Sequence, residues 1–125
     1  MSVIQKHIFV VDDDIMIATM LSDHLRENPL HKVTMFHTGE DCLRNLHLNP
    51  DVIILDYTLS ATDANVANGM EILQQIKKID KNAHVIMLSS QEEYGTALQA
   101  ILKGAVEYVV KDADAFARID HILEG

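Results

Sequence analysis

Five short runs of mainly apolar residues recur along this chain. They occupy residues 7–11, 32–36, 51–56, 84–88 and 106–110. The third run contains Val52 to Leu55 without polar alternation, which is typical of a strand buried on both faces in the centre of a parallel sheet. Asp56 closes this run and would therefore stand at the carboxyl end of a central strand, the edge where open α/β sheets bind ligands.

The segments between these runs have the apolar spacing of amphipathic helices. Helices are predicted from Ile17 to about Asn28, after Thr38, and over residues 69–78, 92–103 and 113–123. Thr38 is a typical N-cap, and Gly104 fits a left-handed stop after the fourth helix. The third helix is expected to bury its apolar stripe, which consists of Ile72, Leu73, Ile76 and Ile79.

Strands that alternate with helices favour βαβ crossovers, in which successive strands are parallel. The prediction is an α/β fold with a five-stranded parallel sheet and helices on both faces. A length of 125 residues and a hydrophobic content of 48% suit one domain with a sizeable core, so residues 1–125 are expected to form a single domain.

Composition restricts the classes of partner. The formal net charge of −9 disfavours direct binding to nucleic acid or to an anionic membrane. Cys42 is the single cysteine, which excludes an internal disulfide framework and favours a cytoplasmic location. No apolar run approaches about 18 residues, so neither a membrane span nor a signal peptide is expected. Seven histidines lack a metal-ligand spacing, and no zinc role is assigned.

Polar residues follow four of the five predicted strands. They are Asp12 and Asp13 after the first, Asp56 at the third, Ser89 after the fourth and Lys111 after the fifth. Because the carboxyl ends of parallel strands share one edge, these residues are expected to converge although they are far apart in sequence.

Converging carboxylates repel one another unless a cation neutralises them, and Mg²⁺ suits one or two carboxylates with a carbonyl and waters. Taken singly, the residues have simpler interpretations. Asp14 would serve as an acidic helix start, Lys111 as a solvated lysine and Ser89 as a turn residue. Beside a phosphorylated carboxylate, however, the Lys111 ammonium can neutralise phosphoryl oxygens and the Ser89 hydroxyl can donate to one.

The order of these residues resembles the receiver domain of bacterial two-component response regulators over essentially the whole chain. The segment Gly104–Lys111 is especially similar to the fifth-strand signature of that family. The resemblance implies a flavodoxin-like fold with strand order 2-1-3-4-5. It assigns an acidic pair to Asp12 and Asp13, the phosphorylated aspartate to Asp56, the switch hydroxyl to Ser89, the switch aromatic to Tyr108, and the lysine to Lys111.

The resemblance also implies a mechanism. Asp56 would accept a phosphoryl group from a sensor histidine kinase, a histidine phosphotransfer protein or a small phosphodonor. Asp13, Asp56 and the backbone carbonyl of Thr58 would hold Mg²⁺, with Asp12 acting partly through water. The product would hydrolyse and reset the switch, so the protein is not expected to be an enzyme in the usual sense.

Signalling would follow when Ser89 is drawn toward the phosphoryl group and Tyr108 turns into the space it leaves. The output surface is then expected on the fourth helix, fifth strand and fifth helix, with Tyr94, Leu98 and Tyr108 as candidates. Its partner would be a downstream target protein or, after phosphorylation, a second copy of the chain. Packing in the core is the simpler interpretation of these three side chains.

Two segments depart from the family pattern. The stretch from Asp56 to Gly69 is about five residues longer than the family spacing, and Ser60 stands where a proline is usual. The hypothesis is that this enlarged loop adds a partner contact or partly shields the phosphorylation site, so that deletion of residues 64–68 would alter partner choice or the dephosphorylation rate. Asp112 replaces the proline that usually follows the lysine. Since a cis bond before a non-proline residue costs about 2.5–4 kcal/mol, the Lys111–Asp112 bond is predicted to be trans.

Three alternatives stay open at this point. A small phosphatase could use Asp12 and Asp14 as nucleophile and acid, although Met16 is atypical for such enzymes. A flavodoxin-like cofactor binder would need phosphate near three repelling aspartates. A receiver-like docking module that is never phosphorylated would share the fold without the chemistry.

Overall fold

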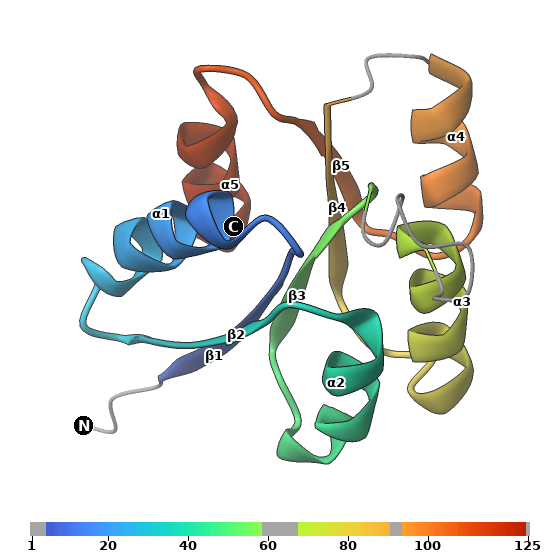
Figure 1. Cartoon of the computed structure of the whole chain (residues 1–125), viewed down its shortest axis with the longest axis horizontal. Coiled ribbons are helices and arrows are strands. Elements are labelled where there is room, and N and C mark those ends of the chain that lie inside the picture. The colour runs from blue at the N-terminus through green and yellow to red at the C-terminus, as the bar shows by residue number, and fades with distance from the viewer. Residues whose placement is uncertain (1–4, 59–67, 91–93, 125) are drawn as a thin grey trace.

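The computed structural model describes residues 5–58, 68–90 and 94–124. Within these ranges the chain forms a five-stranded parallel sheet of order β2-β1-β3-β4-β5 (Figure 1). The strands are β1 (Lys6–Val11), β2 (His31–Phe36), β3 (Val52–Asp56), β4 (Val85–Ser89) and β5 (Glu107–Val110). The predicted flavodoxin-like α/β fold and its strand order are therefore confirmed.

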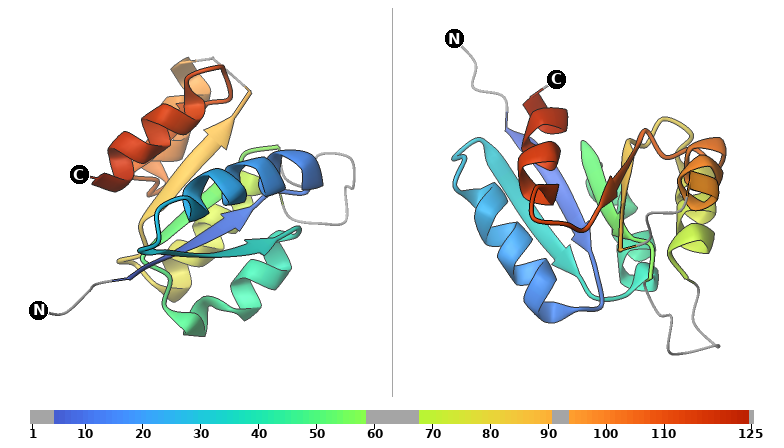
Figure 2. Two further views of the ribbon diagram at one scale, coloured as in Figure 1. Left: turned by 90° about the vertical axis from the view of Figure 1, so that its left-hand side faces the viewer. Right: turned by 90° about the horizontal axis from the view of Figure 1, so that it is seen from above.

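Helices cover both faces of this sheet, as predicted. They are α1 (Ile15–Arg26), α2 (Gly39–Arg44), α3 (Gly69–Ile79), α4 (Tyr94–Leu102) and α5 (Ala115–Glu124), with a short 3-10 helix η1 (Leu46–Leu48) after α2. Helices α1 and α5 lie on one face, and α2, α3 and α4 lie on the other (Figure 1). The start of β1 and the end of α5 meet at the edge opposite the carboxyl ends, where Lys6 Nζ donates to the Leu123 carbonyl at 2.7 Å (Figure 2).

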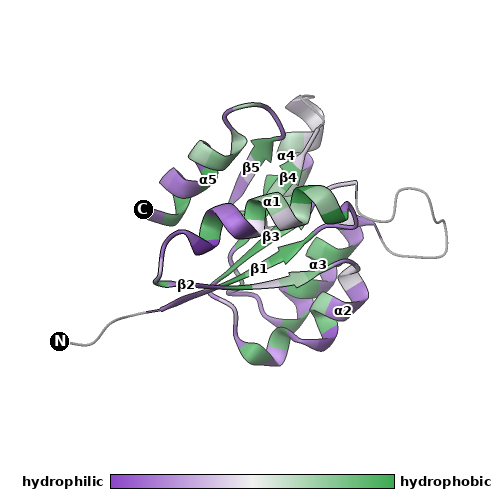
Figure 3. Ribbon diagram, turned by 60° about the vertical axis from the view of Figure 1, so that its left-hand side comes forward, coloured by the Kyte–Doolittle hydropathy of each residue, from purple (hydrophilic) through white to green (hydrophobic). Residues whose placement is uncertain are grey.

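The central strands are buried on both sides, which explains their unbroken apolar sequence. Every residue of β3 and β4 is buried. Ile54 and Ile86 belong to the core beneath α1 and α5, whereas Ile53 and Leu55 belong to the core beneath α2, α3 and α4. The same division is visible as apolar strands between helices whose outer faces are more polar (Figure 3). Each such side chain contributes about 1.5–3 kcal/mol through burial.

Local polar contacts fix where the helices begin. Asp14 caps α1 by accepting from the amides of Met16 and Ile17 at 3.0 and 3.3 Å, and Thr38 caps α2 by accepting from the Asp41 amide at 3.1 Å. Both roles were predicted. Gly104 has φ of +112°, which confirms the left-handed stop after α4.

The prediction for Ile79 was wrong. This side chain is 63% exposed, whereas Ile72, Leu73 and Ile76 are buried as expected. Ile79 is the last residue of α3, and this end of the helix extends past the start of the strands (Figure 1). The helical spacing continues to that residue, but there is no longer a sheet to cover it.

The structure describes part of both segments that depart from the family pattern. The bond between Lys111 and Asp112 is trans, as predicted. Ser60 and most of the long stretch after Asp56 lie outside the described residues. Asn68 is described, and it belongs to the start of α3, because its side chain accepts from the Glu71 amide at 2.9 Å.

Candidate functional site

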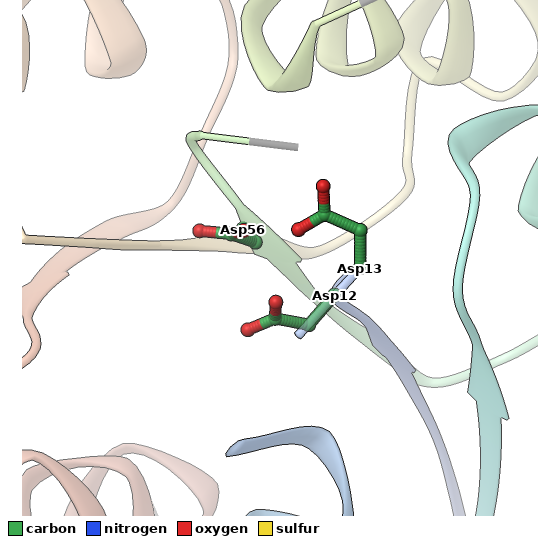
Figure 4. A group of neighbouring side chains, drawn as sticks. All are labelled: Asp12, Asp13 and Asp56. Carbon is green, nitrogen blue, oxygen red and sulfur yellow. The ribbon is translucent and has the colours of Figure 1, made fainter. Parts of the chain in front are cut away.

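Three carboxylates meet at the carboxyl edge of two neighbouring strands. Asp12 and Asp13 directly follow β1, and Asp56 is the last residue of β3, which pairs with β1 (Figure 4). One oxygen from each residue can be chosen such that all three lie within 4.8 Å of one another. The predicted convergence of these residues is confirmed.

Asp12 is held in an unfavourable environment for a charge. Its side chain is 3% exposed, and it accepts from the Asp14 amide at 2.9 Å and from Lys111 Nζ at 3.3 Å. Burial, reinforced by the negative charge of Asp56, raises the pKa of Asp12 to about 6 in spite of these two donors. A cation bound between the carboxylates would relieve this repulsion.

The Asp56 carboxylate is fully buried and oriented by three donors. Lys111 Nζ lies 2.9 Å from its Oδ1, and the Thr58 amide donates to the same oxygen at 3.2 Å. The Thr58 hydroxyl lies 3.1 Å from both carboxylate oxygens. Only the backbone carbonyl of Thr58 was predicted to take part in the site, so these contacts of its amide and hydroxyl were missed.

Lys111 reaches this edge from the end of β5. Its side chain is 17% exposed, and it bridges Asp56 and Asp12. Burial lowers the pKa of Lys111, but the hydrogen bonds and charges of Asp56 and Asp12 outweigh that effect and leave the pKa raised. The lysine is therefore charged and is the counter-ion of the two buried carboxylates.

Ser89 and Tyr108 lie on the same side of the sheet. Ser89 is fully buried at the end of β4, two residues after Met87, and Met87 pairs with Tyr108 of β5. Because side chains alternate along a strand, Ser89 and Met87 share a face. Tyr108 packs against the core on the side of α2, α3 and α4. This arrangement suits coupled movement, and the switch roles of the two residues stay predictions.

Gly69 supports the site in a way that spacing alone did not reveal. A Cβ at this position would collide with the Asp56 backbone oxygen and lie 2.8 Å from the Tyr57 backbone. The first residue of α3 therefore packs directly on the chain that carries Asp56. From the sequence, Gly69 was used only to define the length of the loop after Asp56, and its close packing was not predicted.

Comparison with known proteins identifies the family of this fold. The family model of the response regulator receiver domain matches residues 8–123. The chain belongs to the response regulator receiver domain family. Among curated proteins, this receiver domain is similar to the chemotaxis protein CheY of Listeria monocytogenes, with 30% identity over 118 residues that cover 94% of this chain and 92% of that protein.

Solved structures agree with this assignment. The receiver domain of Thermotoga maritima DrrB, in a form activated with BeF₃, is 32% identical and superimposes with a TM-score of 0.80, covering 98% of this chain and 100% of that one. A LuxR-family response regulator from Aurantimonas has a TM-score of 0.84 at 23% identity, covering 96% of this chain and 83% of that one, which shows the shared fold.

Family membership decides between several of the earlier alternatives. Receiver domains are signalling domains of two-component systems, and their acidic pocket binds Mg²⁺. CheY-like receiver domains interact with kinases and with downstream targets. Membership of this family favours the receiver-domain interpretation over the phosphatase and the flavodoxin-like cofactor binder. Among the described residues, no helix has the length and apolar character needed to cross a membrane.

Proposed function

We propose that this receiver domain is a phosphorylation-dependent switch whose phospho-acceptor is Asp56. The observation that carries the proposal is that buried Asp56 places its Oδ1 2.9 Å from Lys111 Nζ, while one carboxylate oxygen from each of Asp12, Asp13 and Asp56 lies within 4.8 Å of the other two. A nucleophilic carboxylate, a counter-charge and oxygen ligands thus lie within one group of side chains. The donor would be the phosphohistidine of a sensor kinase or of a histidine phosphotransfer protein.

The chemistry is a transfer from nitrogen to oxygen. A carboxylate oxygen of Asp56 attacks phosphorus, the P–N bond breaks, and the imidazole leaves with its electron pair. Lys111 neutralises the charge that moves onto the equatorial oxygens, and the Ser89 hydroxyl donates a hydrogen bond to one of them. Water later hydrolyses the acyl phosphate, which regenerates Asp56 and releases phosphate. Because the chain is both the acceptor of the phosphoryl group and the site of its hydrolysis, we regard it as a switch and not as an enzyme in the usual sense.

The side chains of the pocket fit Mg²⁺. Asp13, Asp56 and the backbone carbonyl of Thr58 would hold the ion, with Asp12 acting partly through water. The raised pKa of Asp12, caused by its burial and then by the charge of Asp56, supports this assignment, because the carboxylates repel one another without a cation. A bound Mg²⁺ supplies positive charge to the phosphoryl oxygens.

The output surface proposed for the switch lies on α4, β5 and α5. Tyr94 is 81% exposed and Leu98 is 45% exposed, so core packing does not account for these two candidates, whereas Tyr108 is half-buried. Movement of Ser89 toward the phosphoryl group would let Tyr108 turn and change this surface. A complete shift from 1:99 to 99:1 requires about 5.5 kcal/mol of differential affinity between the two states.

The setting of this switch is also a proposal. We assign residues 1–125 to one receiver domain that acts in the cytoplasm. Its output partner would be a downstream protein or a phosphorylation-dependent second copy, with no direct contact to nucleic acid or membrane. The net charge of −9 supports the last point.

Intact-mass spectrometry after incubation with acetyl phosphate and Mg²⁺ tests the function. The expected result is the gain of one phosphoryl group, which disappears when Mg²⁺ is chelated or when Asp56 is changed to Ala. Asp51→Ala is the matched control, because Asp51 directly precedes β3 at the end opposite Asp56, and this variant should still be phosphorylated. A chain that gains no mass would be a docking module without the chemistry.

A further inference from the structure

Asp112, the residue that directly follows Lys111, accepts two hydrogen bonds through its carboxylate. Its Oδ1 accepts from the Asp114 amide at 2.9 Å, and its Oδ2 accepts from Arg118 Nη2 at 2.6 Å. The first contact closes an Asx turn, and the second ties the loop to α5. The residue next to Lys111 is thereby restrained on both carboxylate oxygens.

Arg118 restrains the residue on the other side of Lys111 as well. Its Nη1 donates to the Val110 carbonyl at 3.4 Å while Nη2 holds Asp112. A single guanidinium therefore contacts the residues before and after Lys111. The planar fork of arginine can do this, whereas the single ammonium of a lysine cannot present the same pair of donors.

Electrostatics maintains this contact over the physiological pH range. The hydrogen bond from Arg118 lowers the pKa of Asp112, and the same hydrogen bond raises the pKa of Arg118. Both groups are consequently charged near neutral pH. Their side chains are 39% and 43% exposed, so water screens the pair and its contribution to the stability of the fold is small.

The backbone of Lys111 is held from a third direction. Its amide donates to the Ser89 carbonyl at 2.7 Å, which joins the end of β5 to the end of β4. With Val110 and Asp112 held by α5, the start of the Lys111 side chain is fixed relative to the sheet. Its Nζ then lies 2.9 Å from Asp56 and 3.3 Å from Asp12.

We propose that Asp112 and Arg118 are positioning residues that hold the Lys111 ammonium between Asp56 and Asp12. Through an Asx turn and a guanidinium, they fix the backbone on both sides of Lys111. The effect on phosphoryl transfer rests on the function proposed above. The effect on the accessibility of Lys111 does not depend on that function.

The first test compares initial rates of phosphorylation by acetyl phosphate at saturating Mg²⁺. Arg118→Ala and Asp112→Ala should each lower the rate about five- to tenfold, because a displaced ammonium no longer matches the transferring group. Arg44→Ala is the matched control, since Arg44 forms an equally short, exposed ion pair with Asp41 in α2. Rates that fall equally in Arg44→Ala and Arg118→Ala would contradict the proposal.

A double-mutant cycle distinguishes positioning from general support of the fold. In a Lys111→Ala background, Arg118→Ala should change the remaining rate by less than about twofold, because the residue it positions is absent. The same fold-loss in both backgrounds would show that Arg118 acts by another route and would overturn the proposal.

The second test needs no phosphoryl transfer. Lys111 is acetylated with an N-hydroxysuccinimide ester in the absence of Mg²⁺, and its labelling rate is measured by peptide mass spectrometry. Loss of Arg118 should expose the amine and raise that rate more than about twofold, with no change in Arg44→Ala. If Arg118→Ala leaves the labelling rate of Lys111 unchanged, the positioning role is refuted, even if the protein is phosphorylated. If the labelling rate rises but the chain is never phosphorylated, only the proposed function is refuted.

Discussion

The interior of the sheet buries apolar side chains, whereas its carboxyl edge buries charged ones. In the interior, the residues that precede Asp56 in β3 and Ser89 in β4 are buried and apolar, and each adds to the stability of the fold. At the edge, two of three clustered carboxylates are also buried, and the pKa of Asp12 is raised mainly because of that burial. Substitutions should therefore have opposite effects on stability in the two regions.

The largest effect is expected in the interior. Ile54→Ala should lower the free energy of unfolding by about 2–5 kcal/mol, because Ile54 is buried and its removal leaves a cavity. Urea denaturation followed by circular dichroism measures the change. Ile79→Ala is the matched control and should cost less than about 0.5 kcal/mol, since Ile79 is 63% exposed. Equal losses in the two variants would contradict this description of the core.

Gly69 lies where the two regions meet. Gly69→Ala should destabilise the fold by about 1–3 kcal/mol, because the added Cβ collides with the backbone that carries Asp56. Phosphorylation should slow in the same variant. Gly95→Ala is the control: a Cβ there has no atom within 4 Å, and alanine is the better helix former by about 0.5–1 kcal/mol. If the Gly69→Ala protein is as stable as the Gly95→Ala protein, the supporting role of Gly69 is contradicted.

At the edge, the sign of the effect should reverse. Asp12→Asn should stabilise the protein in the absence of Mg²⁺ by about 1–3 kcal/mol near neutral pH, because it removes a buried charge that faces Asp56. The same variant should gain less stability than the native protein when Mg²⁺ is added. Thermal unfolding with and without Mg²⁺ measures both effects. A less stable Asp12→Asn protein in chelator would contradict the proposed repulsion.

The pH dependence gives a smaller and more specific effect. The folded state raises the pKa of Asp12 from 3.8 to about 6, so it takes up a proton at a higher pH than the unfolded chain does. Folding is thus penalised above about pH 6, and the penalty shrinks as the pH falls from about 6 toward about 4. The stability advantage of Asp12→Asn over the native protein should shrink between about pH 7 and about pH 5. An advantage that is constant over this range would assign the effect to another cause.

The fold was predictable because its signals are local. The buried strands produce unbroken apolar runs, and the residues Asp14, Thr38 and Gly104 mark helix ends through contacts within a few positions. The wrong prediction for Ile79 arose because helical spacing cannot show where the sheet beneath a helix ends.

The site was predictable only in its main residues. Parallel topology alone brings the strand ends together, which is why Asp12, Asp56 and Lys111 could be selected from the sequence. The contacts of the Thr58 hydroxyl with Asp56, and the close packing of Gly69, depend on three-dimensional positions that no spacing reports. The same holds for the contacts between Arg118 and the residues that flank Lys111.

Locating the phosphoryl group is the most direct test of the central claim. After incubation with acetyl phosphate and Mg²⁺, reduction with borohydride converts a phosphorylated aspartate to homoserine, which peptide mass spectrometry identifies by position. The account predicts homoserine at position 56, with none at 12 or 13. Homoserine at either of those positions, or at no position in a correctly folded protein, would contradict the assignment of Asp56.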